Sequence, residues 1–325
     1  MKNMLLSQKL LFMLTMIMSM IMCVSSDTIL GIWMSMEINM ISFITLMTSN
    51  QNMMSEKSTM MYFLIQSISS TMVIMSAMYS QMETYYEEFY MNFMFLAILM
   101  KLGMFPFYSW MITTIEGLSW NNCLILTTIQ KIIPLMFMTT YIHSKWIITM
   151  TMMNMMMATF KGLEMFSLRK ILGFSSMNHL SMMMMAMLYS KQLLKFYFMI
   201  YLLMTISLTN FLKNSESNLL FQLLNVNKCN KVNNFIMMVL VFSMAGIPPF
   251  IGFIPKMLVI SMMLKTSMVF TSTLMLILNT TSIFFYMRLM LTNFIMTLNT
   301  IKVKKKEKKN MFPLFVMVSP FMMIM

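Results

Sequence analysis

Residues 91–110 have the sequence MNFMFLAILMKLGMFPFYSW, an apolar run long enough to cross a bilayer. Lys101 lies near its middle, and Pro106 follows five residues later. A charged side chain at membrane depth costs at least about 2.5–3.5 kcal/mol, and a proline removes a hydrogen bond from a helix. Two costly residues in one apolar run indicate a site with a role beyond anchoring the chain.

The composition of the whole chain agrees with membrane insertion. Of the 325 residues, 59% are hydrophobic and only 10% are charged, whereas a soluble domain has roughly 25% charged residues. Runs of about 20 apolar residues, the length of one membrane span, recur along the sequence. Lipid offers no partners for backbone polar groups, so runs this long predict helices rather than barrel strands. The fold class that follows is all-α, a polytopic transmembrane helix bundle.

Eleven membrane spans are predicted along the sequence. Their approximate ranges are 4–24, 28–48, 59–80, 91–113, 120–141, 146–160, 171–189, 196–212, 234–260, 267–287 and 311–325. The first range is interpreted as a span and not as a removed signal, because no small-residue cleavage site follows it. The connections are mostly short, so we expect a single transmembrane domain over residues 1–325, with a first half at about 1–145 and a second at about 146–325.

The positions of the basic residues predict the orientation of this bundle. Lysine and arginine concentrate on the side from which a membrane protein inserts. With eleven spans, four lysines fall on the side opposite the N-terminus: Lys145, Lys191, Lys195 and Lys265. Sixteen basic residues fall on the N-terminal side: Lys2, Lys9, Lys57, Lys161, Arg169, Lys170, Lys213, Lys228, Lys231, Arg288, Lys302, Lys304, Lys305, Lys306, Lys308 and Lys309. We therefore expect the N-terminus inside, and a basic cluster at 302–309 that lies near anionic lipid and does not bind nucleic acid.

The sequence lacks the residues that several classes of protein need for their function. The three cysteines, Cys23, Cys123 and Cys229, are too far apart in sequence for the close ligand clusters of zinc or iron–sulfur sites. No GxGxxG or GxxxxGK[ST] motif occurs, so no nucleotide-phosphate loop is expected. The 57 methionines are spread along the chain, which favours a role as apolar filler over a Cu(I) cluster. No cofactor or metal is expected on this chain.

Four charged residues remain inside the predicted spans: Glu37, Lys101, Lys131 and Lys256. Such residues are candidates for function, against the alternative that they extend to the interface or form static pairs. Prolines accompany the lysines: Pro106 follows Lys101, Pro134 follows Lys131, and the stretch AGIPPFIGFIP precedes Lys256. Two discontinuous helices are therefore predicted, in the fourth and ninth spans. Interrupted helices beside ionisable side chains are typical of ion-translocating membrane proteins.

The choice of lysine favours proton transfer. Burial disfavours the charged form of a lysine and a nearby carboxylate favours it, so Glu37 near Lys101 would let that lysine hold and release a proton. Arginine stays protonated and cannot do this. For energetic reasons we expect Glu37 to lie close to Lys101. His179 is a further candidate relay, although a lone histidine in a helix is more often a hydrogen-bonded structural residue.

Five stretches carry a resemblance to a known family: GIWMSMEINMISF, KLGMFPFYSW, EGLSWNNCLILTTIQKIIP, SSMNH and GIPPFIGFIPK, which occur in this order within residues 31–256. The sequence resembles the antiporter-like membrane subunits of NADH:ubiquinone oxidoreductase, respiratory complex I, and among them subunit 2 in its mitochondrially encoded animal form. The animal members lack three N-terminal helices of their bacterial relatives, which is consistent with eleven spans.

The resemblance implies roles for the buried charges. Glu37 and Lys101 match the family's carboxylate–lysine pair, Lys131 its central lysine and Lys256 the lysine of its second half. It also implies a non-redox, proton-translocating subunit of the mitochondrial inner membrane, with the N-terminus on the matrix side. NADH, FMN, iron–sulfur clusters and ubiquinone would belong to other subunits. The implied partners are a neighbouring antiporter-like subunit, the small quinone-side subunits and lipids such as cardiolipin. A stand-alone cation/proton antiporter of the same fold and a purely structural membrane subunit are the alternatives.

Overall fold

The computed structural model describes residues 2–48, 53–82, 87–141, 146–220, 222 and 231–297. These residues are almost entirely α-helical and fall into two compact units, Met1–Ile147 and Ile148–Met325. The fold is a polytopic transmembrane helix bundle. That the two units form a single transmembrane domain stays a prediction. The predicted span 311–325 and the basic cluster at 302–309 lie outside the described residues.

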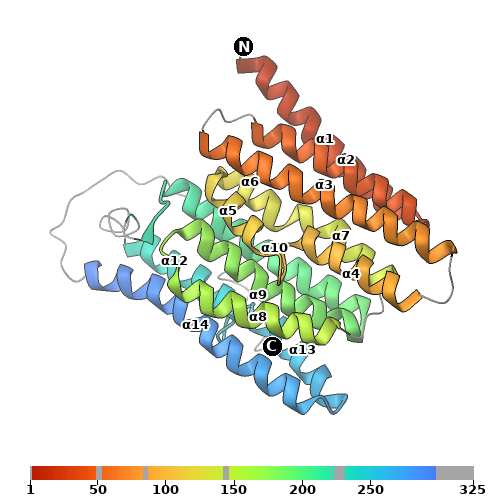
Figure 1. The fold of residues 1–325 in the computed structure, drawn as a ribbon. Helices are drawn as coiled ribbons and strands as arrows, with labels where there is room; N and C mark the ends of the chain where they lie inside the picture. Colours follow the sequence, from red (N-terminus) through yellow and green to blue (C-terminus); the bar gives the residue numbers. More distant parts are fainter. Residues whose placement is uncertain are drawn as a thin grey trace. The chain divides into compact units, whose positions relative to one another are not determined.

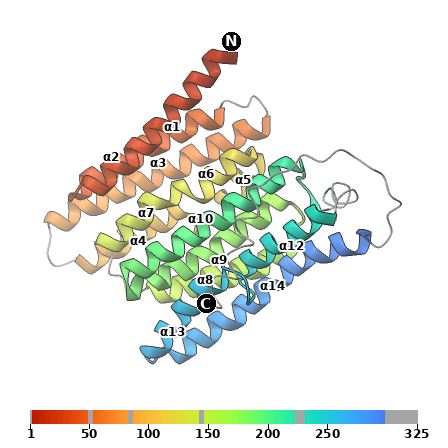
Figure 2. The same ribbon diagram turned by 180° about the vertical axis from the view of Figure 1, so that it is seen from behind.

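In the first unit, helices α1, α2 and α3 run side by side, as both views show (Figures 1 and 2). Helix α3 also contacts α4 and α5, and α7 contacts α1, α2 and α4. The helices of this unit are α1 (Lys2–Ser25), α2 (Ile29–Thr48), α3 (Met53–Met82), α4 (Glu87–Leu102), α5 (Ser109–Gly117), α6 (Trp120–Thr127) and α7 (Ile129–Tyr141). Helix α7 therefore packs against elements from three earlier parts of the chain.

In the second unit, α9 packs against α10 and α13, and α14 contacts α9, α12 and α13 (Figure 1). Helix α9 is the most enclosed, since its residues from Ile171 to Ala186 are all buried. The helices of this unit are α8 (Ile147–Glu164), α9 (Leu168–Tyr189), α10 (Lys191–Asn214), α12 (Lys231–Ala245), α13 (Phe253–Lys265) and α14 (Val269–Thr297). A buried helix at the centre of the unit places its polar side chains, including His179, away from lipid.

Seven helical stretches within the described residues are long and apolar enough to cross a membrane. They are Ser7–Ser25, Ile29–Thr48, Met53–Tyr79, Trp120–Tyr141, Leu168–Tyr189, Lys191–Asn214 and Val269–Met290, and each coincides with a predicted span. The predicted span 146–160 corresponds to α8. The predicted spans 91–113 and 234–260 each consist of two shorter helices with an interruption between them. The chain is thus a multi-pass membrane protein with discontinuous helices.

Hydroxyl side chains inside these helices are satisfied locally. Ser35 donates to the carbonyl of Ile32 at 2.5 Å, and Ser69 donates to the carbonyl of Gln66 at 2.8 Å. Many other serines and threonines make the same bond to the carbonyl three residues earlier. Such bonds compete with helix formation in water, but in an apolar span they give each hydroxyl a partner within its own helix. The serines and threonines therefore do not argue against membrane spans.

The helix α4 ends in the same way as α12. The backbone N–H of Gly103 donates to the carbonyl of Met100, and the N–H of Met104 donates to the carbonyl of Leu99. These two bonds, with φ of 65° at Gly103, make a Schellman ending, which requires a left-handed residue. Glycine adopts that conformation without strain. The proline that follows, Pro106, cannot donate to a continuing helix.

Helix α12 repeats this ending in the second unit. Gly246 has φ of 74°, and its N–H donates to the carbonyl of Ser243 at 3.2 Å. The N–H of Ile247 donates to the carbonyl of Phe242 at 3.3 Å, and two prolines follow at 248 and 249. The two predicted discontinuous helices are therefore confirmed, and each interruption has the same local cause.

Candidate functional site

Two carbonyls at the end of α4 receive side-chain donors. The indole Nε1 of Trp110 donates to the carbonyl of Met100 at 3.0 Å. The amide Nε2 of Gln66 donates to the carbonyl of Lys101 at 3.2 Å. A helix end has four carbonyls without intrahelical partners, and at membrane depth such groups must find partners inside the protein. Residues of α3 and α5 thus stabilise the interruption beside Lys101.

The Lys101 ammonium lies close to the Glu37 carboxylate. The Lys101 Nζ is 3.9 Å from the Glu37 Oε1, and the two side chains are 3% and 20% exposed. This distance is that of an ion pair and is longer than a hydrogen bond. Within the described part of the chain, Glu37 Oε1 is buried and has no hydrogen-bond partner. The predicted proximity of these two residues is confirmed, and their role in proton transfer stays a prediction.

Lys101 and Lys131 line the same small cavity. Its volume is about 20 Å³, and Tyr62, Gln66 and Gln130 also contribute to its wall. A cavity of about 10–15 Å³ or more admits one water molecule when polar partners surround it. Lys131 is 3% exposed. The first unit therefore brings two of the three predicted lysines to the wall of one small cavity, with Glu37 beside one of them.

A second interruption of the helical backbone lies next to Lys131. The sequence associates Lys131 with Pro134, but the structure places Pro134 inside α7. The break is at Thr128, between α6 and α7, where the backbone has φ of −120° and ψ of −74°. Lys131 is consequently the third residue of a new helix, and the position of its side chain depends on what holds the first turn of α7.

A cluster of polar side chains surrounds this first turn. The carboxamides of Asn39 and Gln130 face each other and bond in both directions, at 3.0 and 3.2 Å. The Tyr62 hydroxyl donates to the same Gln130 Oε1 at 3.1 Å. Sequence reasoning missed this Asn39–Tyr62–Gln130 cluster. The available signal was the presence of amides one or two residues from charged residues, in the stretches EIN and QK of two apolar spans.

Lys256 lies at the interruption between α12 and α13. Its Nζ donates to the carbonyl of Ala245, the last residue of α12, at 2.7 Å. The side chain crosses Gly246 so closely that a Cβ there would lie 2.8 Å from Lys256 Cδ and 3.0 Å from Nζ. The negative end of the α12 dipole faces this amine. Gly246 thus serves both the Schellman ending and the passage of the lysine side chain.

His179 lies in a buried aromatic cluster of the second unit. Its Nδ1 is 3.0 Å from the Tyr197 hydroxyl, and its ring centroid is 5.2 Å from that of Tyr201. All three residues are at most 2% exposed. A neutral imidazole has one donor and one acceptor nitrogen, and a hydroxyl can satisfy either tautomer. Tyr197 was not found from the sequence, because a tyrosine in an apolar helix resembles ordinary packing.

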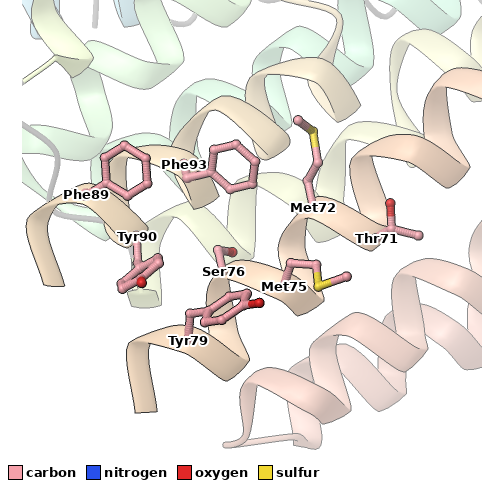
Figure 3. Close-up of a pocket in the computed structure, with 8 residues that line it drawn as sticks. All are labelled: Thr71, Met72, Met75, Ser76, Tyr79, Phe89, Tyr90 and Phe93. Carbon is pink, nitrogen blue, oxygen red and sulfur yellow. The ribbon is translucent and has the colours of Figure 1, made fainter. Parts of the chain in front are cut away.

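A larger pocket lies elsewhere in the first unit. It has a volume of about 330 Å³ and lies between the last part of α3 and the first part of α4 (Figure 3). Thr71, Met72, Met75, Ser76, Tyr79, Phe89, Tyr90 and Phe93 line it, and the rings of Tyr79 and Tyr90 stack at 5.6 Å. These eight side chains include no lysine, carboxylate or histidine. The pocket is therefore separate from the site of the buried charges.

Comparisons with known proteins agree with this architecture. The model of the family described as NADH:quinone oxidoreductase/Mrp antiporter, TM, matches residues 26–284. The chain named NADH-ubiquinone oxidoreductase chain 2 from Anopheles gambiae is 33% identical over 286 residues, which are 86% of this chain and 84% of that one. This chain belongs to the same family. The chain of that name from Locusta migratoria is 34% identical over 300 residues, 90% of this chain and 87% of the other.

A solved structure shows the same fold at low identity. A chain in the structure of respiratory complex I from Thermus thermophilus with bound aureothin aligns with a TM-score of 0.83. The alignment covers 97% of this chain and 76% of that chain, at 16% identity. The predicted family and antiporter-like fold are confirmed by these likenesses.

The predicted site residues therefore form two groups. Glu37, Lys101 and Lys131 come together in the first unit. Lys256 and His179 belong to the second unit. Each of the two interrupted helices predicted from the sequence carries one lysine at the interruption, on α4 or on α13. The chemistry that this arrangement permits is proton exchange between amines, carboxylate and water, because these groups gain and lose protons without forming covalent intermediates.

Proposed function

We propose that this chain is a non-redox, proton-translocating membrane subunit of respiratory complex I, which couples NADH oxidation by ubiquinone to proton movement. The observation that supports it best is the cavity shared by Lys101 and Lys131, with the Glu37 carboxylate 3.9 Å from Lys101. The names of the relatives from Anopheles gambiae and Locusta migratoria support the assignment to complex I.

In the proposed step, the ammonium of Lys101 gives a proton to a water molecule in the cavity. That water gives another proton to the neutral amine of Lys131, so charge moves and no atom is lost. The Glu37 carboxylate favours the charged state of Lys101 before transfer. When Glu37 and Lys101 move apart, the carboxylate no longer stabilises the charged form of Lys101, and the proton passes to the water. Lys256 and, as a candidate relay, His179 would continue the transfer in the second unit.

The energy for this movement has to come from elsewhere in the complex. Moving one charge against 100 mV requires about 2.3 kcal/mol. We propose that redox chemistry on other subunits supplies it through conformational or electrostatic coupling, and that this chain holds no NADH, FMN, iron–sulfur cluster or ubiquinone. We place the chain in the mitochondrial inner membrane, with its N-terminus on the matrix side. Its proposed partners are a neighbouring antiporter-like subunit, the small quinone-side subunits and lipids such as cardiolipin.

The replacement Lys131→Met tests this function in the assembled complex. Methionine fits an apolar helix, so assembly should remain while redox-linked proton pumping and turnover fall at least tenfold. Lys57→Met, at an exposed position of α3, is the matched control and should keep the wild-type rate. Proton uptake into sealed vesicles and NADH oxidation are measured together. Wild-type pumping by a correctly assembled Lys131→Met complex would refute the relay role.

A stand-alone cation/proton antiporter is the second candidate, because the matching family also includes Mrp antiporters. Purification of the chain from its native membrane separates the two candidates. A complex I subunit co-purifies with flavin and iron–sulfur subunits, whereas an antiporter does not and exchanges cations without NADH. In a purely structural subunit, substitution of Lys101, Lys131 or Lys256 by methionine would leave pumping intact.

A further inference from the structure

The Gln130 carboxamide uses its whole hydrogen-bonding capacity. Its oxygen accepts from Asn39 Nδ2 at 3.0 Å and from the Tyr62 hydroxyl at 3.1 Å. Its nitrogen donates to Asn39 Oδ1 at 3.2 Å and to the Met16 sulfur at 3.7 Å. A carboxamide has two donors and two acceptor sites, so no polar atom of Gln130 is left for the cavity that the residue lines.

These bonds attach the first turn of α7 to three other helices. Met16 is on α1, Asn39 on α2 and Tyr62 on α3. Gln130 is the second residue of α7 and lies two residues after the interruption at Thr128. A helix start beside an irregular residue has few intrahelical bonds. Side-chain bonds from neighbouring helices therefore determine where this turn lies, and the next residue along it is Lys131.

Helix α2 connects this attachment to the ion pair. Glu37 and Asn39 are two residues apart on α2, and they contact the ends of two different helices, α4 and α7. The same rigid segment thus contacts Lys101 through a carboxylate and the neighbour of Lys131 through an amide. The placement of both lysines at the cavity therefore involves contacts with α2.

We propose that Gln130 is a positioning residue for proton transfer between Lys101 and Lys131. It holds the first turn of α7, and with it the Lys131 amine, against the shared cavity. This inference rests on the function proposed above, because it needs the two lysines to exchange a proton. Gln130 itself carries no proton onward, since its amide is neutral and its four hydrogen bonds go to Asn39, Tyr62 and Met16.

A role in helix packing alone predicts something different. Interhelical amide bonds in membranes contribute on average about 0.6 kcal/mol and at most about 2, and their loss lowers stability whatever the state of Lys131. A positioning role acts through Lys131 and loses its effect when Lys131 is absent. The two roles can therefore be separated by combining substitutions.

The experiment compares Gln130→Met in two backgrounds of the assembled complex, wild type and Lys131→Met. Methionine keeps the length of glutamine and removes all four hydrogen bonds. An error of about 1 Å in a reacting group can cost on the order of 100-fold, so we expect Gln130→Met to lower proton-coupled turnover about tenfold. In the Lys131→Met background it should change the residual rate by less than about twofold. The amount of assembled complex is measured on native gels.

The comparison variant is Asn154→Leu in the second unit. Asn154 bonds to the carbonyl of Met177 at 3.0 Å and to the Ser181 hydroxyl at 2.9 Å, so its substitution also removes a buried interhelical amide. The factor by which Asn154→Leu changes turnover should be the same in the wild-type and the Lys131→Met backgrounds. If Gln130→Met prevents assembly, Gln130→Asn keeps the amide, shortens it by one methylene and takes its place.

Wild-type turnover with Gln130→Met, or an equal loss in both backgrounds, would overturn the positioning role. Failure of this inference differs from failure of the proposed function. If only this inference fails, Lys131→Met has reduced turnover and Gln130→Met does not, or the fold-losses of turnover of the two variants multiply when they are combined. If the proposed function fails, Lys131→Met itself pumps like the wild type.

Discussion

Replacing Glu37 by glutamine removes one charge from the ion pair with Lys101 and leaves the shape of the side chain almost unchanged. At the observed 3.9 Å, two unit charges attract by about 4 kcal/mol with an effective dielectric constant near 20. The Glu37 side chain is 20% exposed, which lowers this value, and exposed pairs contribute up to about 1 kcal/mol. We therefore expect a coupling energy of about 1–4 kcal/mol between the two residues.

A double-mutant cycle measures this coupling. Glu37→Gln, Lys101→Met and the double mutant are compared in the assembled complex, by NADH oxidation and by proton uptake into sealed vesicles. About 1.4 kcal/mol corresponds to a factor of ten. If the two residues acted independently, the fold-loss of turnover in the double mutant would be the product of the two single fold-losses. The coupling predicts a loss of turnover that is smaller than this product by a factor of about five to 1,000. Glu37→Gln should impair turnover about as much as Lys101→Met, because each variant leaves one charge without its partner.

Glu56→Gln is the matched control, since Glu56 is an exposed carboxylate in the first turn of α3. It should keep the wild-type rate and show no coupling to Lys101→Met. Single losses that multiply in the double mutant, with a coupling below about 0.5 kcal/mol, would refute the functional pair. So would full pumping by an assembled Glu37→Gln complex.

Three further predictions concern the second unit and the isolated chain. Gly246→Ala should reduce turnover at least tenfold in pumping assays, because the new Cβ meets Lys256 at 2.8 Å in a left-handed backbone. Gly162→Ala is the control and should be tolerated, because the nearest neighbours of its new Cβ lie at 3.4–3.5 Å. Equal effects of the two substitutions would contradict this reasoning. Tyr197→Phe removes the hydroxyl 3.0 Å from His179 Nδ1 and should slow pumping severalfold if His179 relays protons, and an unchanged rate would argue for a structural histidine. The purified chain should show no flavin, iron–sulfur or haem absorbance, and a stoichiometric chromophore would overturn the non-redox assignment.

The sequence was most informative where a residue is costly in its surroundings. Lys101 and Glu37 each need a partner at membrane depth, so their proximity followed from energetics alone. The interruption after Lys101 was readable because Gly103 and Pro106 together stop a helix. The same reasoning located the break before Lys256.

The sequence was less informative where many arrangements have similar energy. Asn39 could pair with any amide or hydroxyl in the bundle, and only the packing of α2 against α7 selects Gln130. Thr128 carries no backbone signal of its own, and the break lies there while Pro134 fits inside α7. The roles of Lys131, Lys256 and His179 stay predictions.

The hydrogen bond from Lys256 to the carbonyl of Ala245 restricts how far this side chain can travel. If the amine swings away, a buried carbonyl at the end of α12 loses a partner, which costs about 1–3 kcal/mol. At equilibrium the displaced form would then be roughly five- to 150-fold rarer than the docked one. If Lys256 exchanges a proton, as proposed, a mobile water or a neighbouring group has to approach it, and the exchange takes place at a stationary amine.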